Sequence, residues 1–166
     1  MTGSRSPARV TALRWGAKQS FRAYVAAVGG QIELGGEAAR TEDGEFVWPA
    51  APDSSLVIEE NGALRGVGRF RGRIGFQAHG GMLSVEISDP ILRLETGEGI
   101  LTVAGAGPND RVEIARIDLS SHDLPHGGTL TAPAVITRDG GELLGGHYPA
   151  MTPVDPVVLV AAAEGS

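Results

Sequence analysis

Ser20 and Tyr24 stand four residues apart in a segment whose apolar residues recur with the period of an α-helix. The apolar stripe consists of Ala17, Phe21, Tyr24 and Val25. Residues at this spacing share one helix face, so the alcohol of Ser20 and the phenol of Tyr24 lie together and can donate or accept hydrogen bonds. On pattern alone, a tyrosine in an apolar stripe is more often a core residue whose hydroxyl is satisfied than a ligand-binding residue.

Four histidines provide further metal-binding or acid–base candidates: His79, His122, His126 and His147. His122 and His126 are close in sequence, but Pro125 between them argues against a shared helix face. Asp123 is the only other donor beside them, whereas a zinc site needs about four ligands. A solvated surface loop over residues 119–128 is therefore the better interpretation of this pair.

Other charged residues fit structural roles. Arg69, Arg71 and Arg73 alternate along a predicted strand, where a solvated sheet face explains them better than a stripe that binds a carboxylate ligand. Asp89 and Asp155 each precede a proline, which indicates turns rather than catalytic acids. The sequence has no Gly-x-Ser-x-Gly, Walker A or His-Glu-x-x-His motif.

Composition excludes several classes of protein. The 166 residues include no cysteine, which rules out disulfides, thiolate metal sites and cysteine nucleophiles. The formal net charge is −6, whereas nucleic-acid-binding domains are usually basic, so we expect no nucleic-acid partner. No apolar run approaches the ~20 residues of a membrane span, and no apolar segment of a signal peptide follows the polar N-terminus. We expect no membrane insertion and, for the sequence as written, a cytoplasmic location.

The elements that must position these residues are mainly strands. Glycine makes up 25 of 166 residues and alternates with Val, Ile, Leu and Thr segments, a pattern typical of short strands joined by turns. The one clear helix is predicted over about residues 15–27. Strands are predicted over residues 31–34, 45–48, 56–59, 63–79 (interrupted by glycines), 82–87, 91–95, 99–104, 112–119, 129–137 and 157–160, with a further short strand at 142–144. We predict a mainly β fold, an antiparallel β-sandwich or open barrel of about nine to eleven strands with a short N-terminal helix.

The same patterns divide the chain into two parts. Residues 1–10 form a polar N-terminal lead-in, and residues 11–162 form a single domain of ordinary size. Within that domain, Asn61-Gly62 is a strong signal for a β-hairpin turn.

Three segments of the chain resemble the HtaA domain, the haem-binding domain of actinobacterial haem uptake. The first is Leu13-Arg-Trp-Gly-Ala-Lys-Gln-Ser-Phe-Arg-Ala-Tyr-Val25. The second covers residues 66–90 and includes Phe76-Gln-Ala-His-Gly-Gly-Met-Leu83. The third runs from Gly145-Gly-His-Tyr-Pro-Ala-Met151 to Asp155-Pro156. The matches occur in order over about residues 11–160, which is more specific than any single motif.

The resemblance implies a β-rich fold with short helices that binds ferric haem, as haem b, through an axial tyrosine. The family's serine and tyrosine on the first helix fall on Ser20 and Tyr24, which makes Tyr24 the expected iron ligand. The family's histidine before a Gly-Gly turn falls on His79. His147 departs from the pattern, because the family more typically has an apolar aromatic residue there.

These residue types suit ferric haem. Fe(III) is a hard cation that favours an anionic oxygen, and its charge allows a phenol, which otherwise ionises near pH ~10, to lose its proton at neutral pH. A histidine N–H donated from His79 to the phenolate stabilises it and tunes the iron potential. For Ser20, we expect a hydrogen bond to a haem propionate.

We therefore predict a haem-binding protein, not an enzyme, that holds ferric haem reversibly and exchanges it with another haem-binding or transporter protein as donor or acceptor. Two alternatives remain open at this point. One is a haem-dependent or other small-molecule enzyme on a β scaffold, and the other is a haem-free adhesion or interaction β-sandwich. Family members are typically found at the cell surface or secreted, in contrast to the cytoplasmic location expected above.

Overall fold

The computed structural model describes residues 8–59, 62–120, 128–146 and 148–162. Strands dominate this part of the chain and pair antiparallel throughout, which confirms the predicted mainly β fold. In chain order the elements are β1 Ala8–Trp15, α1 Gln19–Ala27, β2 Gln31–Gly35, β3 Ala39–Arg40, β4 Phe46–Pro49, β5 Val57–Ile58, β6 Leu64–Arg65, β7 Gly68–Arg69, β8 Arg73–Ala78, the 3-10 turn η1 His79–Gly81, β9 Leu83–Ser88, β10 Ile91–Glu95, β11 Glu98–Ala104, β12 Arg111–Asp118, β13 Thr129–Ile136, α2 Arg138–Leu143 and β14 Pro153–Ala161.

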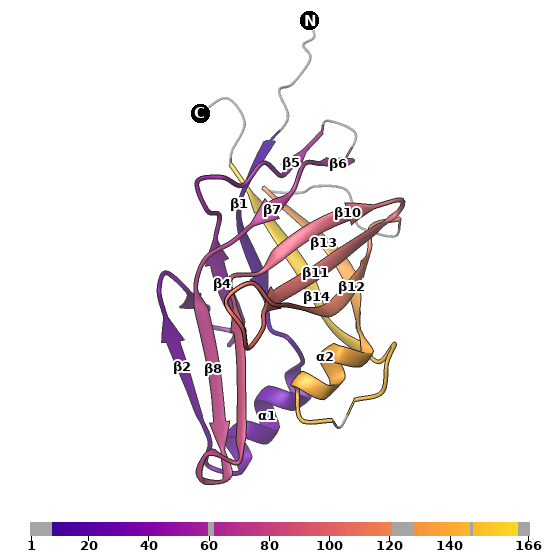
Figure 1. Ribbon diagram of the computed structural model, residues 1–166. Coiled ribbons are helices and arrows are strands. Elements are labelled where there is room, and N and C mark those ends of the chain that lie inside the picture. The colour runs from indigo at the N-terminus through magenta and orange to yellow at the C-terminus, as the bar shows by residue number, and fades with distance from the viewer. Residues whose placement is uncertain (1–7, 60–61, 121–127, 147, 163–166) are drawn as a thin grey trace, which may run out of the picture.

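The strands form two sheets. The larger, 11-stranded sheet has the order β3-β4-β1-β14-β13-β12-β11-β10-β7, with β5 and β6 attached through β1. The smaller sheet has the order β2-β8-β9. It extends away from the larger sheet at one side of the molecule, and α1 and α2 lie below the larger sheet in the view of Figure 1. The arrangement is consistent with the predicted sandwich.

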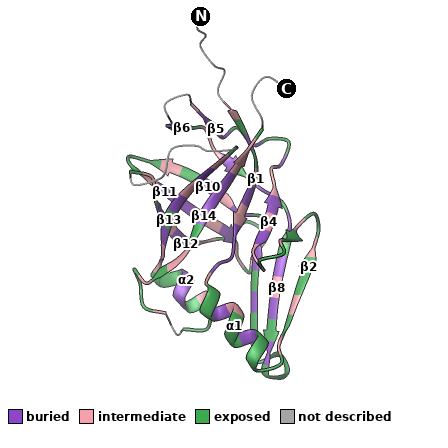
Figure 2. Cartoon of the chain, turned by 180° about the vertical axis from the view of Figure 1, so that it is seen from behind, coloured by how far each residue is buried: buried purple, intermediate pink, exposed green. Residues whose placement is uncertain are grey.

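One apolar cluster joins both sheets and α1. Phe46, Trp48 and Trp15 are buried on the larger sheet, and Phe76 is buried on β8 of the smaller one. Phe76 packs edge-on against Phe46 and against Phe21 of α1, with ring centroids 5.5 Å and 5.1 Å apart. Burial follows the inner faces of the strands and one side of α1 (Figure 2). Phe21 therefore anchors the helix that carries Tyr24 directly in the core.

The first strand was not predicted, because a bulge hides its alternation. Val10, Leu13 and Trp15 of β1 are buried, a spacing of three and then two residues. The pairing of β1 with β14 shifts register between Val10 and Ala12, which inserts the extra residue. The polar lead-in expected over residues 1–10 therefore ends before Ala8, where β1 begins.

The first helix is shorter than predicted, beginning at Gln19 and not near Trp15. Trp15 ends β1. Ala17 then adopts a left-handed backbone conformation with φ of 61°, which separates the strand from the helix. A Cβ atom on Gly16 would lie 2.2 Å from Arg22 Nη1, so a larger residue there would displace the Arg22 side chain. The helix itself and its end before Gly29 agree with the prediction.

A second helix stands where a short strand was expected at residues 142–144. The helix α2 begins after Thr137, whose Oγ1 accepts a hydrogen bond from the Gly140 N–H at 2.9 Å. Gly140 and Gly141 resemble a turn in the sequence, yet both are buried inside the helix. A Cβ on Gly140 would lie 2.1 Å from the Ile114 carbonyl oxygen, so glycine permits the helix to pack directly on a strand backbone.

The long strand predicted over residues 63–79 consists of three strands that belong to different parts of the fold. β6 pairs with β5 in a hairpin, as the turn signal predicted, although Asn61 lies outside the described residues. β7 pairs with β10 in the larger sheet and β8 pairs with β2 and β9 in the smaller one. The chain passes between the sheets at Gly72, whose φ of 130° requires glycine.

Candidate functional site

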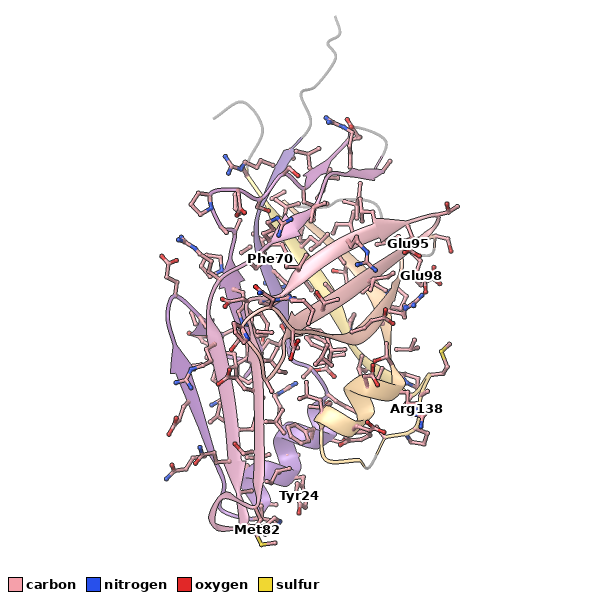
Figure 3. All side chains as sticks on the ribbon, viewed as in Figure 1. Tyr24, Phe70, Met82, Glu95, Glu98 and Arg138 are labelled. Carbon is pink, nitrogen blue, oxygen red and sulfur yellow. The ribbon has the colours of Figure 1, made fainter. Side chains whose placement is uncertain are left out.

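A cavity of about 340 Å³ opens between α1, the β8–β9 turn and the C-terminal end of α2. Its lining consists of Phe21, Tyr24, His79, Met82, Leu83 and Leu144. Figure 3 shows Tyr24 and Met82 together at the lower end of the molecule. The walls are apolar except at the edge formed by Tyr24 and His79, which suits a mainly apolar ligand with one polar or metal-binding centre.

Tyr24 and His79 share a hydrogen bond within this cavity. The Tyr24 hydroxyl oxygen lies 2.5 Å from His79 Nε2. The phenol O–H donates when Nε2 has no proton, whereas a protonated Nε2 donates to a phenolate. Tyr24 is 40% exposed, so it is not the core residue that its place in the apolar stripe suggested. The sequence-predicted pair is therefore brought together, with the phenol oxygen accessible from solvent.

His79 reaches Tyr24 through an unusual backbone turn. Its φ is 55°, in the left-handed region that residues with a Cβ rarely adopt. Gly80 and Gly81 follow with φ of 66° and 95°, so three successive residues are left-handed. This turn ends β8 and directs the imidazole back across the cavity toward α1, which explains why a Gly-Gly pair follows the histidine.

Ser20 lies on the exposed side of α1, one turn before Tyr24. Its hydroxyl is hydrogen-bonded to the Tyr148 hydroxyl at 3.2 Å. Lys18 Nζ lies 5.5 Å from the centre of the Tyr148 ring and donates a hydrogen bond to the Pro153 carbonyl oxygen at 2.8 Å. Tyr148 was not predicted as a site residue, although it follows the Gly-Gly pair of the third resembling segment. The three predicted residues Ser20, Tyr24 and His79 thus occupy one end of the molecule.

Asp155 positions the whole helix and does not start a turn, which corrects the sequence interpretation. It lies in β14, where its Oδ1 accepts the Gln19 N–H at 3.0 Å and its Oδ2 forms an ion pair with Arg22 at 2.6 Å. Its carbonyl oxygen also accepts the Trp15 indole N–H at 2.7 Å. Because Lys18 at the helix start supplies no side-chain cap, the carboxylate of Asp155 accepts the Gln19 N–H from another element.

The remaining candidates have structural roles or lie outside the described residues. Arg69, Arg71 and Arg73 form ion pairs with Asp53, Glu37 and Glu86. They lie in β7, in the connection after it and in β8, so the single strand face predicted for them is wrong. Asp89 does form a turn, with φ of 47°, and accepts the Gly72 N–H. His122, His126 and His147 lie outside the described residues.

A larger cavity of about 540 Å³ lies elsewhere, lined among others by Arg116, Val135 and Met151. It contains none of the predicted site residues. The smaller cavity carries the paired Tyr24 and His79, and we therefore consider it the functional site. Within the described ranges, no group of three or more His, Asp or Glu side chains is placed to bind a metal, and no helix is long and apolar enough to cross a membrane.

Comparison with known proteins identifies the family. The family model for the HtaA domain, described as Htaa, matches residues 11–160. The chain belongs to the HtaA family. The matched range includes Ser20, Tyr24, His79 and Tyr148. No curated protein sequence matches the chain.

Solved structures share the HtaA fold. The N-terminal domain of HtaA from Corynebacterium glutamicum has 22% identity and a TM-score of 0.70, with 97% of this chain and 100% of that chain covered. The C-terminal domain of the same protein has 19% identity and a TM-score of 0.69, covering 95% and 100%. Heme binding protein HtaB from the same organism has 20% identity and a TM-score of 0.68, covering 95% of each chain. At these identities the likeness establishes the fold alone.

Proposed function

We propose that this HtaA-family chain binds ferric haem as its cargo through a Tyr24 phenolate and releases it to another haem-binding or transporter protein. The observation that carries the proposal is the 2.5 Å hydrogen bond between the Tyr24 hydroxyl and His79 Nε2 at an accessible, apolar cavity. Membership of the family and the similarity to a structure described as a haem-binding protein support the same conclusion.

The chemistry of the cavity suits this cargo. Phe21, Leu83 and Leu144 offer apolar walls to a flat macrocycle, and Tyr24 offers the anionic oxygen that a ferric ion favours. His79 stabilises the phenolate by donating Nε2–H to it, because a hydrogen bond to a charged acceptor is about twice as strong as a neutral one. A haem bound at this half-open cavity keeps one edge in solvent, which suits a protein that must release it.

Ser20 and Tyr148 supply the polar end of the proposed site. Their paired hydroxyls lie one helix turn from Tyr24 and are suited to bind a haem propionate. We assign no bond-making or bond-breaking reaction to these residues, and so propose a binding protein and not an enzyme.

Absorbance titration of the purified chain with ferric haem tests the proposal. We expect saturation at one haem per chain and the charge-transfer absorption of a high-spin tyrosinate complex. Tyr24→Phe should lose this absorption and most of the haem, because it removes only the oxygen. The matched control is Tyr148→Phe, which removes the hydroxyl of the other of the two tyrosines and should keep the tyrosinate absorption even where haem is held more weakly. An unaltered tyrosinate band in Tyr24→Phe would refute ligation by Tyr24.

A further inference from the structure

Charged residues are missing from the three segments that build the cavity. Residues 23–32, 74–85 and 143–154 contain no Asp, Glu, Lys or Arg, although 20% of all residues are charged. The first segment covers the C-terminal half of α1, the second covers most of β8 and the first half of β9, and the third contributes Leu144 to the cavity wall. We call the part of the molecule built by residues 23–32 and 74–85 the uncharged end.

The uncharged end also exposes apolar side chains. Met82 is 91% exposed, the highest value among the large apolar residues described, and Val28 is 37% exposed one helix turn after Tyr24. Ala23, Ala26 and Ala27 are also exposed on α1. Met82 and Tyr24 both lie at the lower extremity of the molecule (Figure 3). Depletion of charge around exposed apolar and aromatic side chains is typical of the centre of a protein–protein interface.

Four of the charged groups that border this end are held by contacts within the chain. Arg22 is bound by Asp155, and Lys18 Nζ donates to the Pro153 carbonyl. Arg73 and Glu86, where the uncharged stretch of β8 and β9 begins and ends, form an ion pair with each other. These four charges are therefore not available to attract a charged partner, whereas Glu33, opposite Gly75 where β2 pairs with β8, is exposed at the border of this end.

We propose that the uncharged end is a transient contact surface for a second copy of this chain, which docks with its cavity facing the first. The proposal rests on haem binding at Tyr24 and adds the route by which haem leaves: directly from one cavity to the other. Because a desolvated, unpaired charge is costly, the partner's contact surface must itself be uncharged. The same end of a second copy meets this requirement and gives a symmetric contact.

Electrostatics favour this orientation over others. With a net charge of −6, two copies repel each other wherever their acidic surfaces meet. Contact through the uncharged ends brings few charges to the interface, and charges farther apart than the Debye length of about 8 Å are largely screened at physiological salt. A lipid surface is the less suitable partner, because the uncharged end lacks the Lys and Arg residues that attract anionic headgroups.

Substitutions at Ala27 test the contact without touching the cavity lining. Ala27 is exposed at the last position of α1, and we replace it by Glu and, separately, by Lys. Both charges should weaken the contact, since the opposing surface is neutral. The matched controls are Ala63→Glu and Ala63→Lys. Ala63 is exposed just before β6, at the opposite end of the molecule (Figure 1).

Two measurements are made on the intact chain. Sedimentation equilibrium of unloaded protein should show a mass that rises with concentration and does not fall in 0.5 M salt. Haem exchange from loaded chain to a tagged, unloaded copy should accelerate with the concentration of the unloaded copy. We expect both Ala27 variants to lose the rise in mass and to reduce the concentration dependence of exchange at least tenfold, with both Ala63 variants unchanged.

Several results would overturn the proposal. These are a mass and an exchange rate that do not depend on concentration, opposite effects of Ala27→Glu and Ala27→Lys, or binding to neutral phosphatidylcholine vesicles that both Ala27 variants abolish. The last result would assign the surface to lipid. A chain that self-associates but binds no haem would instead refute the proposed function, so the two failures are distinguishable.

Discussion

The Tyr24 hydroxyl and His79 Nε2 are hydrogen-bonded at 2.5 Å although 55 positions separate the two residues in sequence. The bond joins α1 to the β8–β9 turn across the mouth of the cavity. Neither element alone can hold the phenol oxygen and the imidazole at this distance, because the helix is fixed by Phe21 and Asp155 and the histidine by its left-handed backbone. The two side chains and the residues that hold them in place therefore make separate contributions, which substitutions can measure.

Tyr24→Ala should remove haem binding with little effect on folding. Because the side chain is 40% exposed, we expect the free energy of unfolding to change by no more than about 1 kcal/mol. Phe21→Ala, three residues earlier on α1, removes a buried ring and should cost about 3–5 kcal/mol. Urea denaturation of both variants measures the contrast. A cost of several kcal/mol for Tyr24→Ala would mean that Tyr24 is a packing residue.

Replacing His79 should accelerate haem loss without abolishing binding. A charge-assisted hydrogen bond is worth about 1.5–3 kcal/mol, which corresponds to roughly a tenfold to hundredfold faster transfer to apomyoglobin. His79→Ala and His79→Gly should share this effect, since both lack the imidazole. They should differ in stability, because only glycine adopts the φ of 55° without strain. Unchanged transfer rates in both variants would exclude contact between His79 and the phenolate.

Ser20→Ala tests the polar end of the site. The Ser20–Tyr148 hydrogen bond is exposed, so its loss should change the free energy of unfolding by less than about 0.5 kcal/mol. If the hydroxyl binds a propionate, haem should dissociate several-fold faster while the tyrosinate absorption remains. Esterified haem, which lacks free propionates, provides the control. A mutant effect of equal size with the ester would show that Ser20 acts on some other part of the site.

Asp155→Asn should loosen α1 from the sheet. The Arg22–Asp155 ion pair is mostly buried, with side-chain exposures of 14% and 20%. Loss of the carboxylate charge should therefore lower the free energy of unfolding by about 1.5–3 kcal/mol and speed hydrogen exchange in α1. Glu113→Gln, on β12, also removes one carboxylate from an arginine pair, but Arg116 keeps its second partner Glu98, so the effect should be smaller. Equal losses in both variants would contradict a special role for Asp155.

Gly140→Ala should destabilise the protein even though alanine favours helices. Helix propensity alone predicts a gain of about 1 kcal/mol, but the new Cβ would lie 2.1 Å from the Ile114 carbonyl oxygen. To relieve this clash, α2 must move away from β12. We therefore expect the free energy of unfolding to fall by more than about 2 kcal/mol. Gly75→Ala is the control, since a Cβ there meets nothing within 4 Å. Thermal denaturation distinguishes the two expectations, and a stabilised Gly140→Ala protein would contradict the close approach.

Apolar periodicity and turn residues predicted those elements whose pattern is set by residues near in sequence. The helix containing Phe21 and Tyr24 follows from its apolar stripe, and β10 has the predicted bounds Ile91–Glu95 because alternation and flanking turns are both clear there. The β-bulge in β1 breaks the alternation between Val10 and Leu13, so the strand could not be recognised by period. The role of Gly140 had no local signal, because it allows contact with a strand distant in sequence.

The candidate site was accessible to sequence reasoning mainly through the family resemblance. Tyr24 and Ser20 share a helix face by spacing, but no local pattern connects either of them with His79. The role of Asp155 had no local signal at all, because its carboxylate acts on a helix 133 positions away from its own strand. Tyr148 likewise had no local sequence signal, since its hydrogen bond to Ser20 spans 128 residues.

Because Asp155 holds α1 in place, the helix of a nascent chain is synthesised well before the residue that fixes it. Tyr24 is synthesised early, but the carboxylate that fixes its helix is added only with the last strand. At about 5–20 residues per second, the ribosome needs on the order of ten seconds to cover this distance. Until then β1 lacks its neighbour β14, and the helix lacks its anchor. A chain arrested during translation therefore carries Tyr24 without the strand that holds its helix in place, and under the proposed function we expect it not to capture haem prematurely.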